Sequence, residues 1–528
     1  MSDRKPGLPL ARSSERDEPV PSCRECLRDG AAVFALALGL YAATLAPGVV
    51  WGDSASLAVH VATGRLDVGT AGDHPLFLLA GRAVLPFPGD LAWKLNVLTA
   101  IWGALALTFV YAAAAKLGGS RLAGAGAAAA LAVSHTFWHY SVATGVRTLN
   151  AFFLALLLWL VVDWRSKGAG AARLVPPAAV FLLGLTNHLV LFLALPGIVF
   201  FVGATRPELV RPTRALGLLA GLTALGVTTL LLYPDAREAL SRLWYGPPPI
   251  YHYVLHWPGP VALAREIGFY FAYLVYQFPL LALVLGIAGL RRLLRTDPRA
   301  AVLLLLVMGV NGTVFVKTTE WASLGSTKVT FYLTDYVVFA IFAGLGLADA
   351  GRRAGREAGA ALLVALVVVP IATYAAAHWT LDRLGLDVVR ARDLPYRDEV
   401  RFFLIPSKRG DDSARRYGEE VFRVARPDAV VVADFTPLSV LRYLQVVEGR
   451  RPDLSVVPSH RHHRRIDVAA LVEREIAARP VYVAGRGRRY YDLTGVAPPN
   501  RLELRGPLLE VVPPSRAAES QADAPPSP

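Results

Sequence analysis

Cysteine is scarce in this chain of 528 residues, which contains only Cys23 and Cys26, both before the first apolar run. A structural zinc site needs four ligands, and a redox C-x-x-C pair needs a thioredoxin-like βαβ context. Neither surrounds these two cysteines, and the pair cannot form a disulfide framework. We therefore predict no cofactor and no metal-binding residues. A divalent metal is not ruled out by the sequence, but nothing in it indicates one.

Two nucleotide-binding signatures are also missing. The chain has no Gly-rich Walker loop, which argues against an ATP-driven machine, and no G-x-G-x-x-G follows the buried strand predicted before Asp434. Charged residues make up only 18% of the chain, with a net charge of +14. In a soluble protein, such an excess of positive charge would suggest binding to nucleic acid. Here the basic residues lie mostly in short loops between apolar runs, so we predict no nucleic-acid partner.

Long apolar runs dominate the first 377 residues, the mean hydropathy is +0.42, and 54% of all residues are hydrophobic. A membrane span needs about 20 apolar residues, or fewer where Trp, Tyr and His extend it at the interface. The runs predict a polytopic α-helical membrane protein with about 11 spans. They are residues 31–46, 95–115, 122–133, 149–162, 174–185, 189–202, 215–232, 280–290, 301–316, 336–347 and 360–377.

The loops between these runs alternate in charge. Short basic loops at 116–121, 165–173, 206–214, 291–299 and 352–356 alternate with loops that are longer on average and more sparsely basic. This positive-inside pattern places the N-terminus in the cytoplasm, provided that residues 267–290 form one span kinked at Pro279. The C-terminal domain then lies on the extracytoplasmic side. Low Lys, abundant Arg and Ala and the absence of a eukaryotic targeting signal predict a multi-pass protein of a bacterial inner membrane.

The composition divides the chain into four parts. We predict a disordered cytoplasmic N-terminus at 1–29, a transmembrane domain at 30–377 with a first outer loop at 51–93, a small extracytoplasmic α/β domain at 378–514 and a disordered tail at 515–528. Short buried strands at 429–434, 454–457 and 481–484 alternate with helices, which predicts a small parallel sheet. Asp434 ends the first strand, where it could bind a ligand or cap the next helix.

Asp53 is the leading catalytic candidate. It follows the first span in Trp51-Gly-Asp-Ser, and residues 54–63 after it predict a short interfacial helix. A carboxylate at the membrane surface is partly desolvated and could act as a general base on a lipid-anchored substrate. Asp53 could instead cap that helix.

Further polar residues gather in the same outer loops. Asp73 and His74 could hold a substrate hydroxyl or a phosphate oxygen, and Asn187 and His188 lie at a hairpin between two spans. An aromatic, Pro-rich loop at 244–253, which includes Tyr251, could stack on sugars, form a lid or only pack on the C-terminal domain. Four cations could bind a phosphate or merely snorkel: Arg147, Arg237, Lys317 and Lys328. His135 and His139 share a helix face, and we predict that both belong to an interfacial belt. We predict a solvated loop at residues 460–465.

Several motifs together resemble a family of membrane proteins. They are Trp51-Gly-Asp-Ser-Ala, Asp73-His-Pro-Leu, Ser134-His-Thr-Phe-Trp, Gly184-Leu-Thr-Asn-His, Phe331-Tyr-Leu, Leu394-Pro-Tyr-Arg-Asp and Tyr443-Leu-Gln with Gly449-Arg-Arg-Pro-Asp. In this order they resemble a GT-C-like family with bacterial members of unassigned activity and a eukaryotic protein O-mannosyltransferase acting on plexin-type domains. The match spans roughly residues 31–455.

The resemblance implies an inverting glycosyltransferase. The donor would be a polyprenyl-phosphate sugar with a mannose-like hexose, and the acceptor a hydroxyl of a protein, lipid or glycan. Asp53 would deprotonate that hydroxyl, while Arg237 and His74 would stabilise the leaving phosphate. Gly145 and Arg147 depart from the family, which has an acidic and an aromatic residue at these positions, so acceptor or activity could differ.

Two other classes compete with this interpretation. A transporter or flippase of a lipid-linked substrate would show inverted repeats, and none is evident. A non-catalytic scaffold would use Asp53 as a helix cap. The surroundings of Asp53 discriminate among the three.

Overall fold

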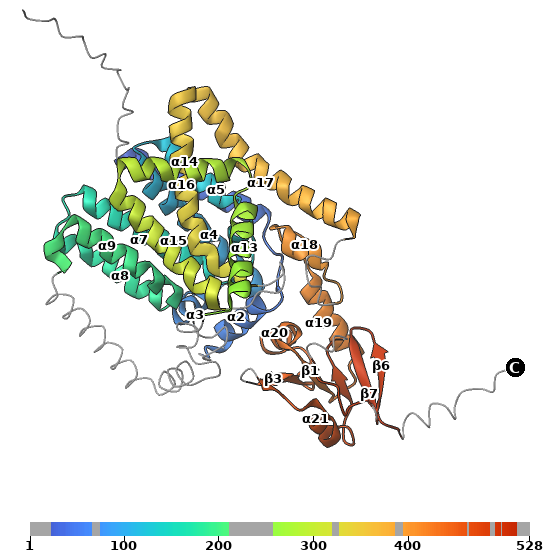
Figure 1. Ribbon diagram of the computed structural model, residues 1–528. Helices are drawn as coiled ribbons and strands as arrows, with labels where there is room; N and C mark the ends of the chain where they lie inside the picture. Colours follow the sequence, from blue (N-terminus) through green and yellow to red (C-terminus); the bar gives the residue numbers. More distant parts are fainter. Residues whose placement is uncertain are drawn as a thin grey trace, which may run out of the picture.

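The computed structural model describes residues 23–65, 74–210, 257–318, 327–385, 394–461, 464–485, 491–497 and 499–514. Within these residues, a large bundle of apolar helices carries a small α/β unit at one end (Figure 1). This is the predicted class of fold, a polytopic helical protein followed by a small α/β domain.

The bundle contains helices of very different lengths. Those of the predicted membrane domain are α1 (Cys23–Ala43), α4 (Leu91–Gly118), α5 (Arg121–Ala132), α7 (Arg147–Ser166), α8 (Val175–Leu185), α9 (Leu195–Thr205), α13 (Pro260–Gln277), α14 (Leu281–Thr296), α15 (Pro298–Thr318), α16 (Leu333–Ala354) and α17 (Arg356–Leu384). Five helical stretches of the described residues are long and apolar enough to cross a membrane, or six if α13 and α14 form one bent span. The total of about 11 spans stays a prediction.

α16 forms the centre of the bundle. In its most apolar stretch 94% of the residues are buried, against 17% for α17, which projects from the bundle (Figure 1). α4, α5, α7, α14, α15 and α17 all contact α16. An apolar helix that is buried all round is the core of the domain, whereas α17 leaves apolar side chains free for lipid.

The predicted kink at Pro279 is a full break. α13 ends at Gln277, Leu280 takes a left-handed φ of 47°, and α14 leaves at 106° to α13. A proline kink of one continuous span, as predicted, would bend the chain far less. α14 packs closely on α16, because a Cβ at Gly289 would collide with the carbonyl oxygen of Phe342.

Ion pairs tie together the end of the bundle far from the α/β unit. Lys116 Nζ lies 2.5 Å from Asp163 Oδ1, and Arg165 forms a two-pronged pair with Asp297. These cations belong to loops and helix ends predicted to be cytoplasmic. Their clustering at one end agrees with the charge pattern of the sequence.

The α/β unit has a mixed five-stranded sheet of order β2-β1-β5-β7-β6. β1 (Val430–Ala433) pairs in parallel with β2 (Ser455–Pro458) and β5 (Val481–Val483), as predicted. The antiparallel hairpin of β6 (Arg501–Arg505) and β7 (Leu508–Val512) was not predicted. Around the sheet lie α19 (Ser413–Val424), α20 (Phe435–Val446) and α21 (Val468–Glu475), whereas α18 (Glu399–Leu404) contacts α17 of the bundle. A short pair, β3 (His460–Arg461) and β4 (Arg464–Arg465), replaces the loop predicted there.

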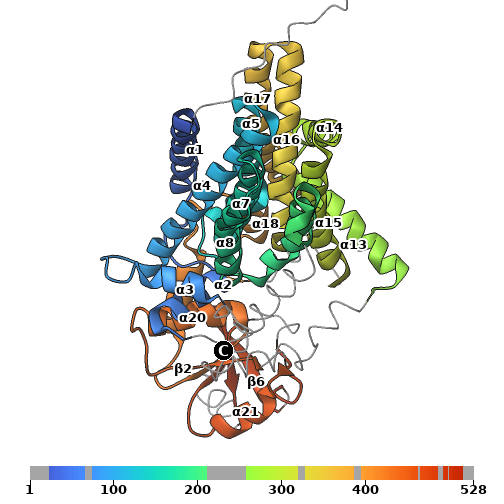
Figure 2. The same cartoon turned by 90° about the vertical axis from the view of Figure 1, so that its left-hand side faces the viewer.

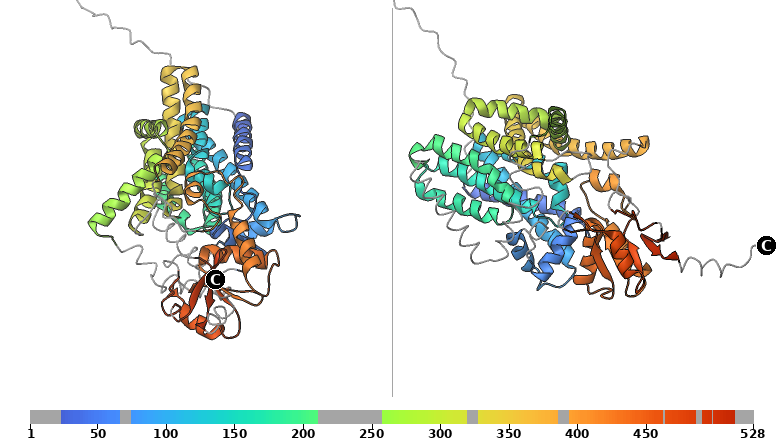
Figure 3. Two further views of the ribbon diagram at one scale, coloured as in Figure 1. Left: turned by 90° about the vertical axis from the view of Figure 1, so that its right-hand side faces the viewer. Right: turned by 60° about the horizontal axis from the view of Figure 1, so that its bottom comes forward.

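The α/β unit rests on the first loop of the bundle. α20 packs against α2 (Asp53–Thr63), which precedes α3 (Pro75–Arg82) (Figures 2 and 3). Trp51 Nε1 donates to Ser413 Oγ at 2.9 Å, and the Trp51 ring lies 5.1 Å from that of Tyr417. The buried Trp51 indole thereby holds the α/β unit next to the start of α2, where Gly52 and Asp53 follow Trp51.

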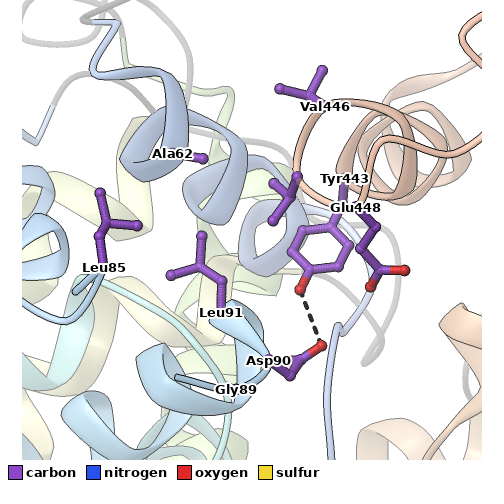
Figure 4. Close-up of a pocket in the computed structure, with 9 residues that line it drawn as sticks. Ala62, Leu85, Gly89, Asp90, Leu91, Tyr443, Val446 and Glu448 are labelled. Carbon is purple, nitrogen blue, oxygen red and sulfur yellow. Dashed lines mark hydrogen bonds between the residues drawn. The ribbon is translucent and has the colours of Figure 1, made fainter. Parts of the chain in front are cut away.

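A cavity of about 330 Å³ lies along this contact. Its wall includes Asp90 and Glu448, and Tyr443 donates to Asp90 Oδ2 at 3.2 Å (Figure 4). Arg415 bonds both carboxylates, at 3.0 Å and 2.6 Å. Because these charges are satisfied within the protein, we read this cavity as part of the domain contact.

Candidate functional site

Asp53 begins α2 but does not cap it. Gly52 is the cap residue, with a φ of 69° that favours glycine. The Asp53 carboxylate makes no hydrogen bond to a backbone amide among the described residues, and 47% of the side chain is exposed. The alternative of a purely structural cap is therefore wrong, and the carboxylate is accessible from solvent.

Arg147 faces Asp53 from the first turn of α7. Its Nη1 lies 3.7 Å from Asp53 Oδ2, which is too long for a hydrogen bond, so the ion pair is loose. The guanidinium lies 4.8 Å from the centre of the Tyr140 ring and 5.8 Å from that of Phe331. Only 13% of the side chain is exposed. Two aromatic faces thus hold the cation in place, and its hydrogen-bond donors stay available to an anion.

Two histidines lie near this pair. His74 Nδ1 is 2.6 Å from the carbonyl oxygen of Asn187, and its ring stacks on that of His188 at 5.1 Å. The carbonyl can only accept, so His74 carries its proton on Nδ1 and offers Nε2 as an acceptor. Asn187 in turn donates from Nδ2 to the carbonyl oxygen of Val146 at 3.1 Å. This bond ties the histidines to the start of α7.

Both histidines are neutral at pH 7. Burial lowers the pKa of His74, and the nearby Arg147 cation lowers it further. Burial also lowers the pKa of His188 to about 3, with contributions from His74 and Arg147. His74 therefore cannot supply the positive charge predicted for it. The cation beside Asp53 is Arg147, which the sequence offered both as one of four candidate phosphate-binding cations and as a departure from the family.

The predicted site residues divide into two groups. Asp53, His74, Asn187 and His188 come together around Arg147 from α2, the start of α3, the 187–188 turn and α7. Asp73, Arg237 and Tyr251 lie outside the described residues.

The other predicted cations are engaged elsewhere. Lys317 lies 4.7 Å from the centre of the Trp257 ring, and Lys328 is buried 2.5 Å from Glu266 Oε2. A buried, paired ammonium is a poor site for a further anion.

The sequence interpretation missed a second set of residues beside the ion pair. His135 and His139, predicted as belt residues, instead line a cavity of about 80 Å³ together with Tyr140 and Gln277. His135 is only 8% exposed, so it does not lie at a lipid interface. The sequence did contain one signal for this second set of residues. Gln277 is a polar residue inside a predicted span, and such residues are functional candidates by default.

Asp434 is a helix cap. Its carboxylate accepts from the Thr436 amide at 3.2 Å and from the Tyr491 hydroxyl at 3.0 Å. Of the two alternatives left open by the sequence, the cap is thus the one observed. In the parts of the chain that the structure describes, no three His, Cys, Asp or Glu side chains are grouped to hold a metal ion.

Comparison with known proteins yields matches on both sequence and structure. Residues 59–210 match the family model described as the protein O-mannosyl-transferase TMEM260 N-terminal domain. "Protein O-mannosyl-transferase TMEM260" of Mus musculus is 34% identical over 149 residues, or 28% of this chain and 21% of the relative. The Dictyostelium discoideum protein of the same name is 22% identical over 333 residues, or 57% of this chain and 38% of that protein. The matches thus cover well under half the length of either relative.

The structural likeness extends over most of the chain. ArnT from Cupriavidus metallidurans superimposes with a TM-score of 0.53 when bound to undecaprenyl phosphate and 0.54 in the apo state. The alignments cover 92% and 91% of this chain and 97% of ArnT, at 14% and 16% identity. At this identity the likeness shows the fold. The resemblance predicted from the motifs is thus confirmed: residues 59–210 match the N-terminal domain of the TMEM260 family, and the chain has the fold of the GT-C membrane glycosyltransferases.

Proposed function

We propose that the protein is a membrane glycosyltransferase that moves a mannose-like hexose from a polyprenyl-phosphate donor to an acceptor hydroxyl with inversion. The observation that carries the proposal is the loose pair of Asp53 and Arg147 at the first outer loop. A base and a phosphate-binding cation side by side are what this displacement requires. The names of the two relatives and the lipid bound to ArnT support the same chemistry.

In the proposed step Asp53 takes the proton of the acceptor hydroxyl. The acceptor oxygen attacks the anomeric carbon as the bond from that carbon to the phosphate oxygen breaks. Polyprenyl phosphate leaves with the electron pair, and its growing negative charge is met by Arg147. When the phosphate binds Arg147, the ion pair with Asp53 opens, and the Asp53 carboxylate is free to accept the proton of the acceptor hydroxyl.

The neutral histidines position the reacting groups. His74 offers Nε2 as an acceptor, so it can hold a hydroxyl of the sugar or of the acceptor without competing for the phosphate. His188 Nδ1 accepts from the Val190 amide at 3.2 Å, which leaves the proton on Nε2 as a donor. Asp73, Arg237 and Tyr251 stay candidate substrate contacts.

The setting we propose is a bacterial inner membrane. The N-terminus lies in the cytoplasm and the α/β domain with Asp53 on the outer side, where a lipid-linked donor and a protein, lipid or glycan acceptor would meet. The basic cluster at the far end of the bundle supports this orientation. A scaffold is disfavoured because Asp53 caps no helix.

The test is sugar transfer from radiolabelled polyprenyl-phosphate mannose and glucose in membranes that contain the protein. The wild type should transfer one of the two sugars, and Asp53→Asn should reduce transfer by about 10²–10⁴-fold. Asp412→Asn is the matched control, since Asp412 is similarly exposed (58%) but lies in the α/β unit, away from Arg147. Transfer that survives Asp53→Asn would contradict the site, and transfer of neither sugar by the wild type would contradict the proposed donors.

A further inference from the structure

The cavity beside Tyr140 contains unused hydrogen-bonding atoms. His135 Nε2, Thr136 Oγ1, His139 Nδ1 and Gln277 Nε2 are buried and have no partner among the described residues. Thr136 is 1% exposed and Gln277 0% exposed. An unsatisfied buried polar atom costs about 1–3 kcal/mol, so four around one cavity are unusual in a folded protein unless water or a ligand satisfies them.

The direction of the Gln277 amide is fixed. Its Oε1 accepts from the Thr136 backbone amide at 2.7 Å, at the start of α6 (His135–Ser141). The Nε2 group is therefore the half of the amide left for a ligand. The break between α13 and α14 makes this arrangement available, because Gln277 is the last residue of α13 and lies on the cavity wall.

The lining of the cavity is uncharged and mostly apolar, with polar groups at a few points. No Asp, Glu, Lys or Arg is among its described lining residues, whereas Tyr140, Tyr273 and Tyr276 supply aromatic faces. Burial lowers the pKa of His135 to about 3 and keeps it neutral, and the nearby Lys408 cation acts in the same direction. Neutral donors and acceptors with aromatic walls suit a ligand that has many hydroxyls and an apolar ring face.

The cavity adjoins the ion pair. The ring of Tyr140 lies 4.9 Å from that of His139 on the cavity side and 4.8 Å from the Arg147 guanidinium on the other. Phe403 and Leu404, from the segment that leads to the α/β unit, close another wall. A volume of about 80 Å³ has room for several water-sized groups, and hence for the hydroxyl edge of one sugar.

We propose that this cavity, the Thr136 pocket, binds the sugar ring of the donor and selects an uncharged hexose. The inference rests on the proposed function and extends it, since the phosphate of the same donor binds Arg147 beyond Tyr140. A sugar with an ammonium group finds no carboxylate among the described lining residues and lies near the Arg147 cation. A sugar with a carboxylate finds no free cation on the described wall.

The experiment measures lipid binding without an acceptor, so that no transfer takes place. Purified protein in nanodiscs is titrated with polyprenyl-phosphate mannose, polyprenyl-phosphate aminoarabinose and bare polyprenyl phosphate. Thr136→Val removes the hydroxyl at nearly constant volume, and Thr136→Ser restores it. Thr373→Val is the matched control, because the Thr373 hydroxyl bonds the Val369 carbonyl of its own helix at 2.8 Å.

Thr136→Val should weaken binding of the mannose lipid by about 10-fold or more and leave binding of bare polyprenyl phosphate unchanged. Thr136→Ser and Thr373→Val should bind both lipids as the wild type does. Gln277→Glu keeps the oxygen that accepts from the Thr136 backbone amide and replaces the amide nitrogen by a second carboxylate oxygen, so the side chain becomes an anion. Binding by this variant should shift from the mannose lipid toward the aminoarabinose lipid.

The outcomes separate the pocket from the proposed reaction. Equal binding of the mannose lipid by wild type and Thr136→Val would overturn the pocket, whatever the transfer assay shows. A wild type that prefers the charged sugar would also overturn it. Binding of the mannose lipid that depends on Thr136, in a protein that transfers no sugar to any acceptor, would support the pocket and overturn the proposed activity alone.

Discussion

Substitution of Arg147 should separate an effect on catalysis from an effect on folding stability most clearly. We expect Arg147→Gln to lower kcat/KM for sugar transfer by about 100-fold, the effect of losing one preorganised group that stabilises about 2.7 kcal/mol of transition-state charge. Its effect on folding should be small. The partner, Asp53, is half-exposed and lies at 3.7 Å, and such a pair contributes about 0–1 kcal/mol.

Arg165 on the same helix is the matched control. It also lies over an aromatic ring, that of Phe201 at 4.8 Å, and pairs with Asp297, but at the far end of the bundle. Arg165→Gln should lower the midpoint of thermal unfolding and leave kcat/KM per folded molecule unchanged. Arg147→Lys should fall between wild type and Arg147→Gln, because an ammonium keeps the charge but lacks the planar fork.

The assay combines transfer kinetics with thermal unfolding of the same purified samples. Unchanged kcat/KM in Arg147→Gln would refute the role of the cation. A similar loss of kcat/KM in Arg165→Gln would show that the bundle as a whole, rather than the site, is sensitive to these changes.

Three further predictions concern the same end of the molecule. Asp53→Asn should leave the unfolding midpoint within about 1 °C of the wild type, because the carboxylate caps no helix; a clear drop would restore the structural role. His188 has a pKa far lower folded than unfolded, so the unfolded chain binds more protons below about pH 6.5 and stability falls as the pH drops from there towards 3. His188→Asn should flatten this fall between pH 7.5 and 5, and identical slopes would contradict the assignment. Trp51→Phe removes the bond to Ser413 and should weaken docking of the α/β unit by about 1–2 kcal/mol, seen as faster limited proteolysis; unchanged cleavage would show that the bond contributes little.

The elements with strong local signals were predictable from the sequence. The buried strand at 429–434 was placed within a residue of β1, and the interfacial helix at 54–63 within a residue of α2, since each has an apolar pattern with a turn signal at its boundary. Strand β6 of the later hairpin was missed because its residues are exposed or half-buried and carry little apolar pattern.

The site was predictable only in part. Asp53 and His74 stood out as polar residues near predicted membrane boundaries. The pairing of Asp53 with Arg147 was not predictable, because Arg147 follows 94 positions later in sequence and meets Asp53 only in the folded chain. The neutral state of His74 likewise depends on burial and on the nearby Arg147 cation, neither of which is visible in a sequence.

The break after Gln277 bears on how the protein responds to its bilayer. Straight spans accommodate a thicker or thinner membrane by tilting. α14 instead leaves α13 at 106° and is locked against α16 where Gly289 meets Phe342. The end of α13 is thereby anchored to the centre of the bundle, while exposed α17 is free to tilt. Activity should therefore depend little on lipid chain length, and hydrophobic mismatch should be absorbed at the edge of the molecule.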